Sequence, residues 1–379
     1  MTGITAIIGW IFCAAAVAGA LYAIACAFAV QRFANAKIQA GPPVPVTVLK
    51  PLYGAEPQLA ENLTTFCRQD YAAPVQLVLG MHQSDDGAFR IAQSIKAANP
   101  ALDVALVAGS ARHGANPKIS NLLNMLPAAK HDLLVISDSD IAVPPHYLAV
   151  VAAAVQMPGT GVVTCCYTGR PAVTGLWPRL SAMGINQHFL PDVLFALAHG
   201  FASPCFGSTI ALKRSVLDEI GGLQTFADRL ADDYEIGRAV RSLGYRLNVP
   251  PLIVSHSCAE MTPGDVFRHE LRWARTIRLV NPSGFAGSIV THAIPLSLIG
   301  CLVLAFAPAA LGVLAAAIAA RVWLAIHINT RFGTADPIWL VPARDLLSFM
   351  VFIGALFAGR VDWRGARFQV SSAGAIAQD

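Results

Sequence analysis

The sequence predicts an α/β domain with a mostly parallel sheet, flanked by N-terminal and C-terminal transmembrane helices. The first observation is composition: the chain of 379 residues is 55% hydrophobic and 13% charged, whereas soluble proteins carry about 25% charged residues. The second is the uneven distribution of this excess, which falls in long stretches near both ends of the chain. The third is a middle region in which short apolar runs alternate with helix-like segments, the pattern of βαβ units.

The N-terminal apolar stretch is predicted to be a membrane anchor. Residues Thr2 to Val30 contain no charged side chain, and a helix of that length crosses the ~30 Å of hydrocarbon in a bilayer. The segment lacks the basic n-region and cleavage site of a signal peptide, which indicates a retained anchor. Arg32 and Lys37 follow directly, so the positive-inside rule places the next domain in the cytoplasm.

A second apolar zone near the C-terminus is predicted to form two spans. Residues 279–320 contain no Asp, Glu, Lys or Arg, and Pro295 and Pro308 interrupt them. The expected spans cover about Ile289–Phe306 and Ala309–Ile328. This zone and the N-terminal anchor together predict an integral membrane protein.

A third apolar stretch, Leu346–Gly359, is shorter than a comfortable span. Three interpretations remain open for it. The stretch is re-entrant, or it is interfacial, or it belongs to a longer span that buries Arg344 and Asp345 as a pair.

Charge and cysteine content exclude several classes of function. The net charge of +4 is too small to argue for nucleic-acid binding. Eight cysteines show no Cys-x-x-Cys spacing, and Cys165 and Cys166 are adjacent. Reduced cysteines therefore fit better than disulfides or a zinc site.

Four short apolar runs in the middle of the chain are expected strands, at residues 45–49, 76–79, 103–107 and 133–136. Helix-like segments such as Ala88–Ala98 and Ile119–Ala129 lie between them. This alternation predicts right-handed crossovers and a mostly parallel sheet. Neither a Gly-x-Gly-x-x-Gly pattern after the first strand nor a Walker lysine motif is present, which disfavours dinucleotide-binding and P-loop proteins.

The fourth expected strand ends in two carboxylates, in the run Asp132-Leu-Leu-Val-Ile-Ser-Asp-Ser-Asp140. Ligands of open α/β sheets bind outside the carboxyl ends of the strands. Mg²⁺ or Mn²⁺ commonly lies between one or two carboxylates and a substrate diphosphate. The run therefore indicates a metal and nucleotide site at Asp138 and Asp140, with a solvated turn as the alternative.

Two downstream patterns also have two interpretations each. Asp232, Asp233 and Glu235 open a helical segment, either as catalytic acids or as acids that complement the helix dipole. The segment Arg268-His-Glu-Leu-Arg272-Trp273-Ala-Arg275 places three arginines on one helical face. That face either lies against anionic lipid headgroups or binds a diphosphate, since Arg matches phosphate oxygens bidentately.

In this order, the motifs resemble the membrane-anchored, inverting glycosyltransferases of the GT-A fold. The resemblance is closest to the ceramide glucosyltransferase family, including its bacterial hopanoid-associated branch, and covers about residues 45–368. It is carried by Val48-Leu-Lys-Pro-Leu-Tyr-Gly54, Asn62-Leu-Thr-Thr-Phe-Cys-Arg-Gln-Asp-Tyr71, His113-Gly-Ala-Asn-Pro-Lys-Ile-Ser-Asn-Leu122, Ile136-Ser-Asp-Ser-Asp-Ile141, Gly207-Ser-Thr-Ile-Ala-Leu-Lys-Arg214, Gly221-Gly222, Ala231-Asp-Asp-Tyr234, Arg272-Trp273 and Trp363-Arg-Gly-Ala-Arg-Phe368.

The resemblance implies a donor site for a UDP-sugar. Pro51 would end the first nucleotide-binding strand, and Asp86 would be the early aspartate that helps to hold the uridine. Lys118 would lie near the donor. Asp138 and Asp140 would hold the donor through its ribose and through Mg²⁺ or Mn²⁺.

The resemblance also implies the catalytic residues. Asp233 would be the general base, and Arg272 with Trp273 would close over the pyrophosphate and the acceptor. His269 stands where the motif expects Gln or Arg, so Arg268 is a candidate substitute. Gly87 follows Asp86 where relatives often have Pro, and the adjacent Asp85 makes the early position ambiguous.

The implied organisation is an N-terminal anchor (residues 1–31), a cytoplasmic GT-A domain (42–263), an interfacial helix (264–285), a C-terminal membrane region (286–360) and a tail (361–379). The implied location is a bacterial inner membrane. Candidate acceptor-side residues are His188 and His269, and segments 184–192 and 201–206 are candidate acceptor entrances.

The expected function is transfer of glucose or N-acetylglucosamine from a UDP-sugar to a lipid hydroxyl, giving a β-glycoside. Ceramide and a hopanoid polyol are both candidate acceptors. The alternatives are a processive polysaccharide synthase and a catalytically inactive membrane scaffold. The sequence does not predict the oligomeric state.

Overall fold

The computed structural model describes residues 3–83, 87–357, 360–363, 366–370 and 376–378. Asp85 and Asp86, the candidates for the early aspartate, lie outside these residues, as do Arg364 and Gly365 of the tail motif. The chain divides into two compact units. The helical unit comprises Met1–Ala36, Thr174–Ala202 and Glu260–Trp363, and the sheet unit comprises Lys37–Val173, Ser203–Ala259 and Arg364–Asp379.

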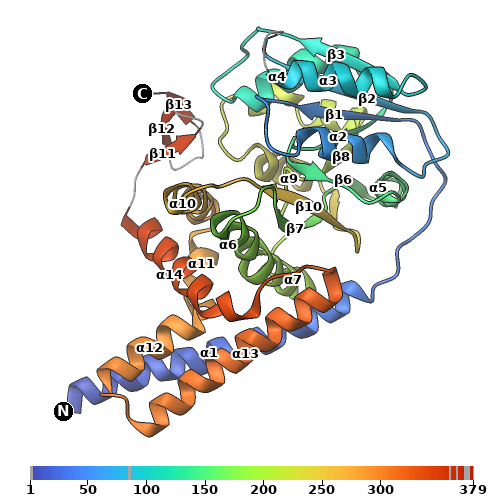
Figure 1. Cartoon of the computed structure of the whole chain (residues 1–379). Coiled ribbons are helices and arrows are strands. Elements are labelled where there is room, and N and C mark those ends of the chain that lie inside the picture. Colours follow the sequence, from blue (N-terminus) through green and yellow to red (C-terminus); the bar gives the residue numbers. More distant parts are fainter. Residues whose placement is uncertain (1–2, 84–86, 358–359, 364–365, 371–375, 379) are drawn as a thin grey trace. The chain divides into compact units, whose positions relative to one another are not determined.

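The sheet unit alternates strands and helices along much of its length (Figure 1). Its strands are β1 (Val46–Pro51), β2 (Val75–Met81), β3 (Asp103–Ala108), β4 (Leu133–Ile136), β5 (Ile141–Ala142), β6 (Thr160–Val163), β7 (Cys166–Pro171), β8 (Ile210–Lys213), β9 (Arg246–Asn248), β10 (Ile253–Cys258), β12 (Ala366–Val370) and β13 (Ile376–Gln378). Its helices are α2 (Leu59–Cys67), α3 (Gly87–Ala98), α4 (Pro117–Met125), α5 (Tyr147–Val155), α8 (Arg214–Glu219) and α9 (Asp232–Ser242), with 3₁₀ turns at Leu126–Ala128 and Leu223–Phe226.

The main sheet has seven strands in the order β3-β2-β1-β4-β8-β6-β9. The first four are mutually parallel, with Val46 opposite both Val75 and Leu133. β8 pairs antiparallel with β4 and with β6, and β9 runs parallel to β6. The predicted α/β fold with a mostly parallel sheet is confirmed, and all four predicted strands are present.

A smaller sheet in the same unit has the order β5-β10-β7. β10 pairs antiparallel with β5, so that His256 lies opposite Ile141, and it runs parallel to β7. β5 begins directly after Asp140, so this pairing places the C-terminal half of β10 beside the acidic motif. β12 and β13 pair antiparallel.

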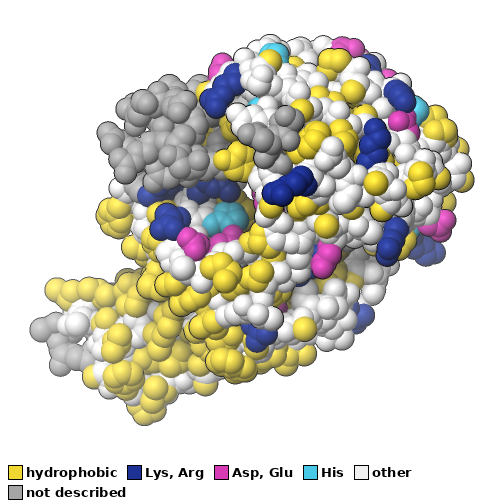
Figure 2. All heavy atoms as spheres, turned by 45° about the horizontal axis from the view of Figure 1, so that its top comes forward, with side chains coloured by type: hydrophobic (Ala, Val, Ile, Leu, Met, Phe, Trp, Pro, Cys, Tyr) yellow, Lys and Arg dark blue, Asp and Glu magenta, His cyan; other side chains and the backbone are white. Residues whose placement is uncertain are grey.

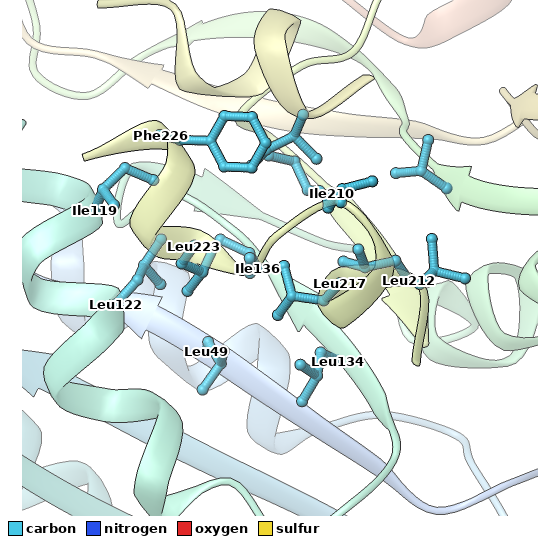
Figure 3. Packing of buried hydrophobic residues seen from close by; sticks show 14 of the residues in the cluster. Leu49, Ile119, Leu122, Leu134, Ile136, Ile210, Leu212, Leu217, Leu223 and Phe226 are labelled. Atoms are coloured by element: carbon cyan, nitrogen blue, oxygen red, sulfur yellow. The ribbon is translucent and has the colours of Figure 1, made fainter. Parts of the chain in front are cut away.

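The central strands are buried on both faces, as parallel strands covered by helices are. β4 is fully buried, and so are residues 46–50 of β1. Figure 3 shows the packing on one face, where side chains from β1, β4 and β8 meet those of α4, α8 and the Leu223–Phe226 turn. The labelled residues of this cluster are Leu49, Ile119, Leu122, Leu134, Ile136, Ile210, Leu212, Leu217, Leu223 and Phe226.

The helical unit contains apolar helices of different lengths and one helix of 18 residues that is rich in charged side chains. Its elements are α1 (Gly3–Ala34), α6 (Leu176–Gly184), a π-helical segment (Ile185–Phe189), α7 (Leu190–His199), α10 (Pro263–Val280), α11 (Pro282–Gly287), a 3₁₀ turn (Ser288–Thr291), α12 (Ala293–Val303), α13 (Pro308–Phe332), a 3₁₀ turn (Ile338–Leu340), α14 (Val341–Phe357) and β11 (Arg360–Trp363). α1 packs against both α12 and α13 (Figure 1).

Among the described residues, three helical segments are long and apolar enough to cross a membrane: Gly3–Ala34, Pro308–Phe332 and Ile338–Phe357. The pair Pro282–Thr291 and Ala293–Val303, bent by 63°, would make a fourth if it is one broken span. Hydrophobic side chains gather over the α1, α12 and α13 bundle (Figure 2). Large apolar residues exposed there include Ile4, Ile7, Trp10, Leu21, Phe28, Leu302, Leu311 and Ile326.

Arg344 and Asp345 are both buried in α14, but they do not form the pair that one interpretation of this stretch expected. Arg344 pairs with Glu270 at 2.5 Å. Asp345 pairs with Arg321, with an Nε–Oδ2 distance of 2.8 Å. Consecutive helical residues point about 100° apart, so each of the two reaches a different neighbouring helix.

Candidate functional site

The acidic loop, residues 137–140, follows β4 at the carboxyl end of the parallel strands. The backbone N–H of Asp138 donates to the carbonyl of Gly207 at 3.1 Å. The carbonyl of Asp140 accepts from the N–H of Ser257 at 2.9 Å. The side chain of Asn62 donates to the Ser139 carbonyl at 3.3 Å. These bonds from three separate segments fix the backbone that carries the two predicted donor-binding carboxylates.

A buried lysine from β1 lies beneath this loop. Lys50 is fully buried, and its ammonium donates to the carbonyl of Asp138, to the Ile141 carbonyl at 3.4 Å and to Ser137 Oγ at 3.3 Å. It also lies 4.1 Å from the centroid of the Phe66 ring, a cation–π contact. Burial lowers the pKa of Lys50 to about 7, and the charges of the acidic loop oppose that decrease.

Lys118 connects two of the acidic motifs. Its Nζ lies 2.8 Å from Asp138 Oδ1 and 3.1 Å from Asp232 Oδ2. Its position follows from the local sequence, because Asn116 caps α4 by accepting from the N–H groups of Lys118 and Ile119, with Pro117 in the first turn. Burial opposes its charge, but Asp138 and Asp232 hold the pKa of Lys118 well above its usual value.

Asp233 lies in the first turn of α9, where the helix dipole favours a carboxylate. Its Oδ2 accepts from the N–H of Gly207 at 3.0 Å and its Oδ1 from the N–H of Tyr234 at 2.7 Å. Burial, followed by the charge of Asp232, raises the pKa of Asp233 to about 6. Gly207 therefore bonds two predicted site residues, because its carbonyl accepts from Asp138 and its N–H donates to Asp233.

Asp140 has a partner that sequence reasoning missed. His256 Nε2, on β10, lies 3.2 Å from Asp140 Oδ2. Although burial of the ring opposes its protonation, Asp140 raises the pKa of His256 well above the usual value. A protonated His256 cannot itself bind a cation, so its role is to orient the Asp140 carboxylate, an oxygen ligand of the kind that Mg²⁺ and Mn²⁺ both prefer.

The predicted metal ligands Asp138 and Asp140 differ in their surroundings. Asp138 is engaged by Lys118, which leaves the Asp140 carboxylate, oriented by His256, as the better ligand for a divalent cation. Within the described residues, no group of three or more His, Cys, Asp and Glu side chains forms a complete metal cage. Donor phosphate oxygens and water would therefore have to complete the coordination, as is usual for such ions.

The remaining donor-side residue, Pro51, is the last residue of β1 and pairs with Gly80 of β2. It directly follows Lys50 at the carboxyl end of the strand. Asp86 lies outside the described residues, so its role as the early aspartate stays a prediction.

His269, Arg272 and Trp273 belong to the helical unit, on α10. Thr262 and Asp265 form a capping box that starts this helix. His269 Nδ1 hydrogen-bonds the carboxylate of Glu260, and its ring packs edge-on against Trp273 with centroids 4.6 Å apart. Burial alone would raise the pKa of Glu260. The contact with His269 outweighs this effect and lowers that pKa to about 2.

Arg268, the candidate substitute for the missing Gln or Arg, is exposed and pairs with Asp265 at 2.5 Å.

His188, the other candidate acceptor residue, lies in the π-helical segment of the helical unit. Its Nε2 lies 2.9 Å from Asp345 Oδ1 and 3.1 Å from the guanidinium of Arg321. His188 is therefore part of an ionic network rather than of an apolar core.

Known proteins give an independent view of the chain. A model of glycosyl transferase family 21 matches residues 9–376. Ceramide glucosyltransferase 1 from Caenorhabditis elegans is 24% identical over 365 residues, which cover 90% of this chain and 75% of the relative. Ceramide glucosyltransferase 3 from the same organism is 23% identical, with coverage of 87% and 74%.

Among solved structures, a mannosyltransferase from Pyrobaculum calidifontis, in complex with GDP-Man and Mn²⁺, matches with a TM-score of 0.53 and 23% identity. The match covers 93% of this chain and 99% of that chain. This likeness shows a GT-A-like glycosyltransferase fold. Since the family model extends over nearly the whole sequence, the chain belongs to glycosyl transferase family 21.

Proposed function

We propose that the protein transfers a sugar from a UDP-sugar to a hydroxyl of a membrane lipid and inverts the anomeric carbon. The observation that carries this proposal is the double role of Gly207, whose backbone bonds both Asp138 and Asp233. Asp138, a predicted donor-binding residue, and Asp233, the predicted base, are far apart in the sequence but hydrogen-bond to the same residue. An inverting transfer needs this closeness, because base and leaving group act on a single sugar carbon.

The donor half of the site supplies charge for the nucleotide. Asp138, held by Lys118, is suited to accept hydrogen bonds from the ribose hydroxyls. Asp140, oriented by His256, would hold Mg²⁺ or Mn²⁺, and a bound cation would neutralise negative charge on the departing UDP. Arg272 would add charge-assisted hydrogen bonds to the pyrophosphate, and Trp273 would cover the acceptor.

The acceptor half depends on Asp233. Its raised pKa, about 6, leaves the carboxylate ionised near neutral pH but makes it a stronger base than an ordinary aspartate. It would take the proton of the lipid hydroxyl as that oxygen attacks the anomeric carbon, a contribution of typically 10²–10⁴ in rate. One displacement inverts the carbon, so an α-linked donor gives a β-glycoside.

A lipid acceptor is supported by the apolar helices and by relatives named ceramide glucosyltransferases. Removing a lipid from a bilayer costs about 0.8 kcal/mol per exposed CH₂, so an enzyme that stays in the membrane has a clear advantage. The relatives favour glucose and ceramide over N-acetylglucosamine and a hopanoid polyol. Arg32, at the end of α1, and Lys37 support a catalytic unit on the cytoplasmic side of a bacterial inner membrane.

The replacement Asp233→Asn tests the role of the base. We expect transfer to fall by at least 10²-fold, because the amide cannot accept the proton. UDP affinity should stay within about threefold, measured by calorimetry on the purified full chain with Mn²⁺. If UDP binding falls as far as transfer does, Asp233 is a donor ligand instead of the base.

Product analysis separates the proposal from the two alternatives. Lipid mass spectrometry after incubation with UDP-glucose or UDP-N-acetylglucosamine should show one added sugar per lipid. A ladder of sugars would indicate a processive synthase. The absence of any transfer with either donor, ceramide or a hopanoid polyol, and Mn²⁺ would indicate an inactive scaffold.

A further inference from the structure

The helical unit contains a group of buried polar side chains whose hydrogen-bonding capacity is only partly used. Within the described part of the chain, Gln187 Oε1, Glu270 Oε1, His292 Nδ1, Ser348 Oγ, and Arg344 Nε and Nη1 are buried without a hydrogen-bond partner. We call these five residues the polar cluster. A buried polar atom left unpaired costs about 1–3 kcal/mol, so six such atoms in one helical unit indicate a ligand that satisfies them.

Arg344, Glu270 and Ser348 form the part of the cluster that lies on α10 and α14. The Arg344 side chain is among the largest fully buried ones in the described structure, and its Nη2 donates to Glu270 Oε2 at 2.5 Å. Ser348 lies one helical turn after Arg344 on the same face of α14. A Cβ built at Gly184 would lie within 3.0 Å of both Arg344 and Glu270, so the glycine leaves room for both of them beside the helix that leads to Gln187.

A fixed ionic network supports the cluster. Arg321 binds Asp345 through Nε at 2.8 Å and through Nη2 at 2.9 Å, and its Nη2 also donates to the Gln187 carbonyl at 2.8 Å. His188 completes this network, and its ring centroid lies 6.0 Å from that of His292. These satisfied contacts hold the unsatisfied atoms in place.

The π-helical segment Ile185–Phe189 supplies the second, independent observation. A π-helical turn inserts an extra residue at a local energetic cost and occurs often at functional sites. Here it brings three consecutive polar residues into the unit: Asn186 and Gln187 are buried and bond Asp336, while His188 bonds Asp345. Without the extra residue, consecutive side chains of an α-helix would point about 100° apart.

The charges of the cluster restrict the ligand. Two guanidinium groups, Arg321 and Arg344, are balanced by two carboxylates, Asp345 and Glu270, and a third carboxylate, Asp336, bonds Gln187. Burial, followed by Arg321, lowers the pKa of His188 to about 4, so that ring adds no positive charge at neutral pH. With no surplus positive charge, the cluster is unsuited to a phosphate headgroup.

The unpaired atoms also restrict the hydrogen bonds of the ligand. Gln187 Oε1 and Glu270 Oε1 are acceptors and require two donors from the ligand, whereas the free N–H groups of Arg344 require acceptors. A headgroup with several hydroxyl or amide groups provides both. Diacylglycerol, with its single hydroxyl, cannot satisfy both acceptors.

We propose that the polar cluster is a binding site for the uncharged, multiply hydroxylated or hydroxyl-and-amide headgroup of a membrane lipid. The inference rests on the proposed function, because it assigns the acceptor of that reaction a place in the helical unit. It also gives Gln187, Glu270, Arg344 and Ser348 roles that no motif indicated.

The test measures lipid binding without nucleotide. The full chain is reconstituted in phosphatidylcholine nanodiscs, and the affinity for fluorescent short-chain ceramide is titrated, with fluorescent diacylglycerol as the comparison. The variants are Ser348→Ala and Arg344→Lys, which keeps the charge opposite Glu270 but removes the free guanidinium donors. Ser297→Ala is the matched control, because Ser297 is also buried but donates to the carbonyl of Ile294 at 2.8 Å within its own helix.

We expect ceramide to bind the wild type at least tenfold more tightly than diacylglycerol. Ser348→Ala should weaken ceramide binding about three- to tenfold and Arg344→Lys at least tenfold, with the KM for the UDP-sugar unchanged. Ser297→Ala should bind as the wild type does. The Tm of Ser348→Ala should equal or exceed that of the wild type, because the variant removes an unpaired hydroxyl.

The proposal is overturned if both variants bind ceramide like the wild type, which would mean that the cluster holds only water. Equal wild-type affinity for ceramide and diacylglycerol, or no affinity for ceramide, also overturns it. The two proposals fail separately. Tight, variant-sensitive lipid binding without sugar transfer refutes the proposed function alone, and sugar transfer with insensitive binding refutes the polar cluster alone.

Discussion

A completely buried lysine is stable only where its ammonium finds acceptors, and Lys50 finds them around the acidic loop. Hydrophobic periodicity places this residue in a strand. Nothing in the local sequence predicts that its side chain reaches the loop after β4, the neighbouring strand in the sheet. Its amino group donates to the carbonyls of Asp138 and Ile141, one on each side of Asp140. Its role is to position the loop.

Replacement of Lys50 by Met tests this role. We expect the Kd for Mn²⁺ with UDP to rise 10- to 100-fold, since hydrogen bonds to a charged group contribute about 1.5–3 kcal/mol. Calorimetric titration of the purified chain measures it, and circular dichroism checks the fold. Lys130→Met is the control, because that lysine forms an exposed pair with Asp103, and such pairs contribute at most about 1 kcal/mol. An unchanged Kd for Lys50→Met would show that the loop holds its shape without the ammonium.

The raised pKa of Asp233 predicts a pH dependence. The base works only when ionised, so kcat/KM should fall as the pH drops through about 6, the pKa of this carboxyl. Burial and the charges of Asp232 and Asp138 raise this pKa, and Lys118 lowers it. Asp232→Asn removes one raising charge, so the acid limb of its pH–rate profile should shift to lower pH. A limb that stays in place would mean that another group controls it.

At the scale of elements, local sequence predicts strands and helices but not which strands become neighbours. The runs that form β1 to β4 were predictable because each is a short apolar stretch; β1, β2 and β4 are buried on both faces, whereas β3, at the edge of the sheet, is only partly buried. The antiparallel placement of β8 beside β4 was not, because strand order depends on long-range packing. His256 was missed for this reason: a single histidine in a strand carries no spacing motif, and only the pairing of β10 with β5 brings it to Asp140.

The turn before β8 leads to a prediction at Gly207. A Cβ at this position would overlap the Asp138 carboxylate and lie 3.0 Å from Lys118 Nζ. Gly207→Ala should therefore displace the donor-binding pair and raise the Kd for UDP at least tenfold while the chain still folds. Gly312→Ala, where a Cβ meets nothing within 4 Å in α13, should leave the Kd unchanged and add up to about 1 kcal/mol of stability. Equal UDP affinity for both variants would refute the steric argument.

At the scale of the whole molecule, the path of α14 decides the topology. Its composition permits a membrane crossing, but both of its ends contact α10: Arg344 binds Glu270, and Arg278 of α10 donates to the carbonyls of Ala355 and Leu356 at 2.6 and 2.8 Å. α10 is rich in charged residues and is not among the apolar helices. A helix with both ends beside a polar helix lies along one surface of the bilayer, which favours the interfacial interpretation of α14.

Cysteine accessibility in intact cells tests this topology. In a background with Cys67→Ser, which removes the one described cysteine that is not buried, single cysteines replace Ala309 at the start of α13, Ala335 after this helix and Phe357 at the end of α14. In the proposed orientation, which rests on Arg32 and Lys37, the sheet unit begins in the cytoplasm, so a membrane-impermeant maleimide should label only the Ala309 position. Positions 335 and 357 should become labelled only in inverted vesicles, because α13 returns the chain to the cytoplasmic side and α14 stays there. Labelling of position 357 from outside would establish α14 as a fourth crossing. Its two ends would then be separated by the thickness of the bilayer, and this separation is incompatible with the contacts that both ends make with α10.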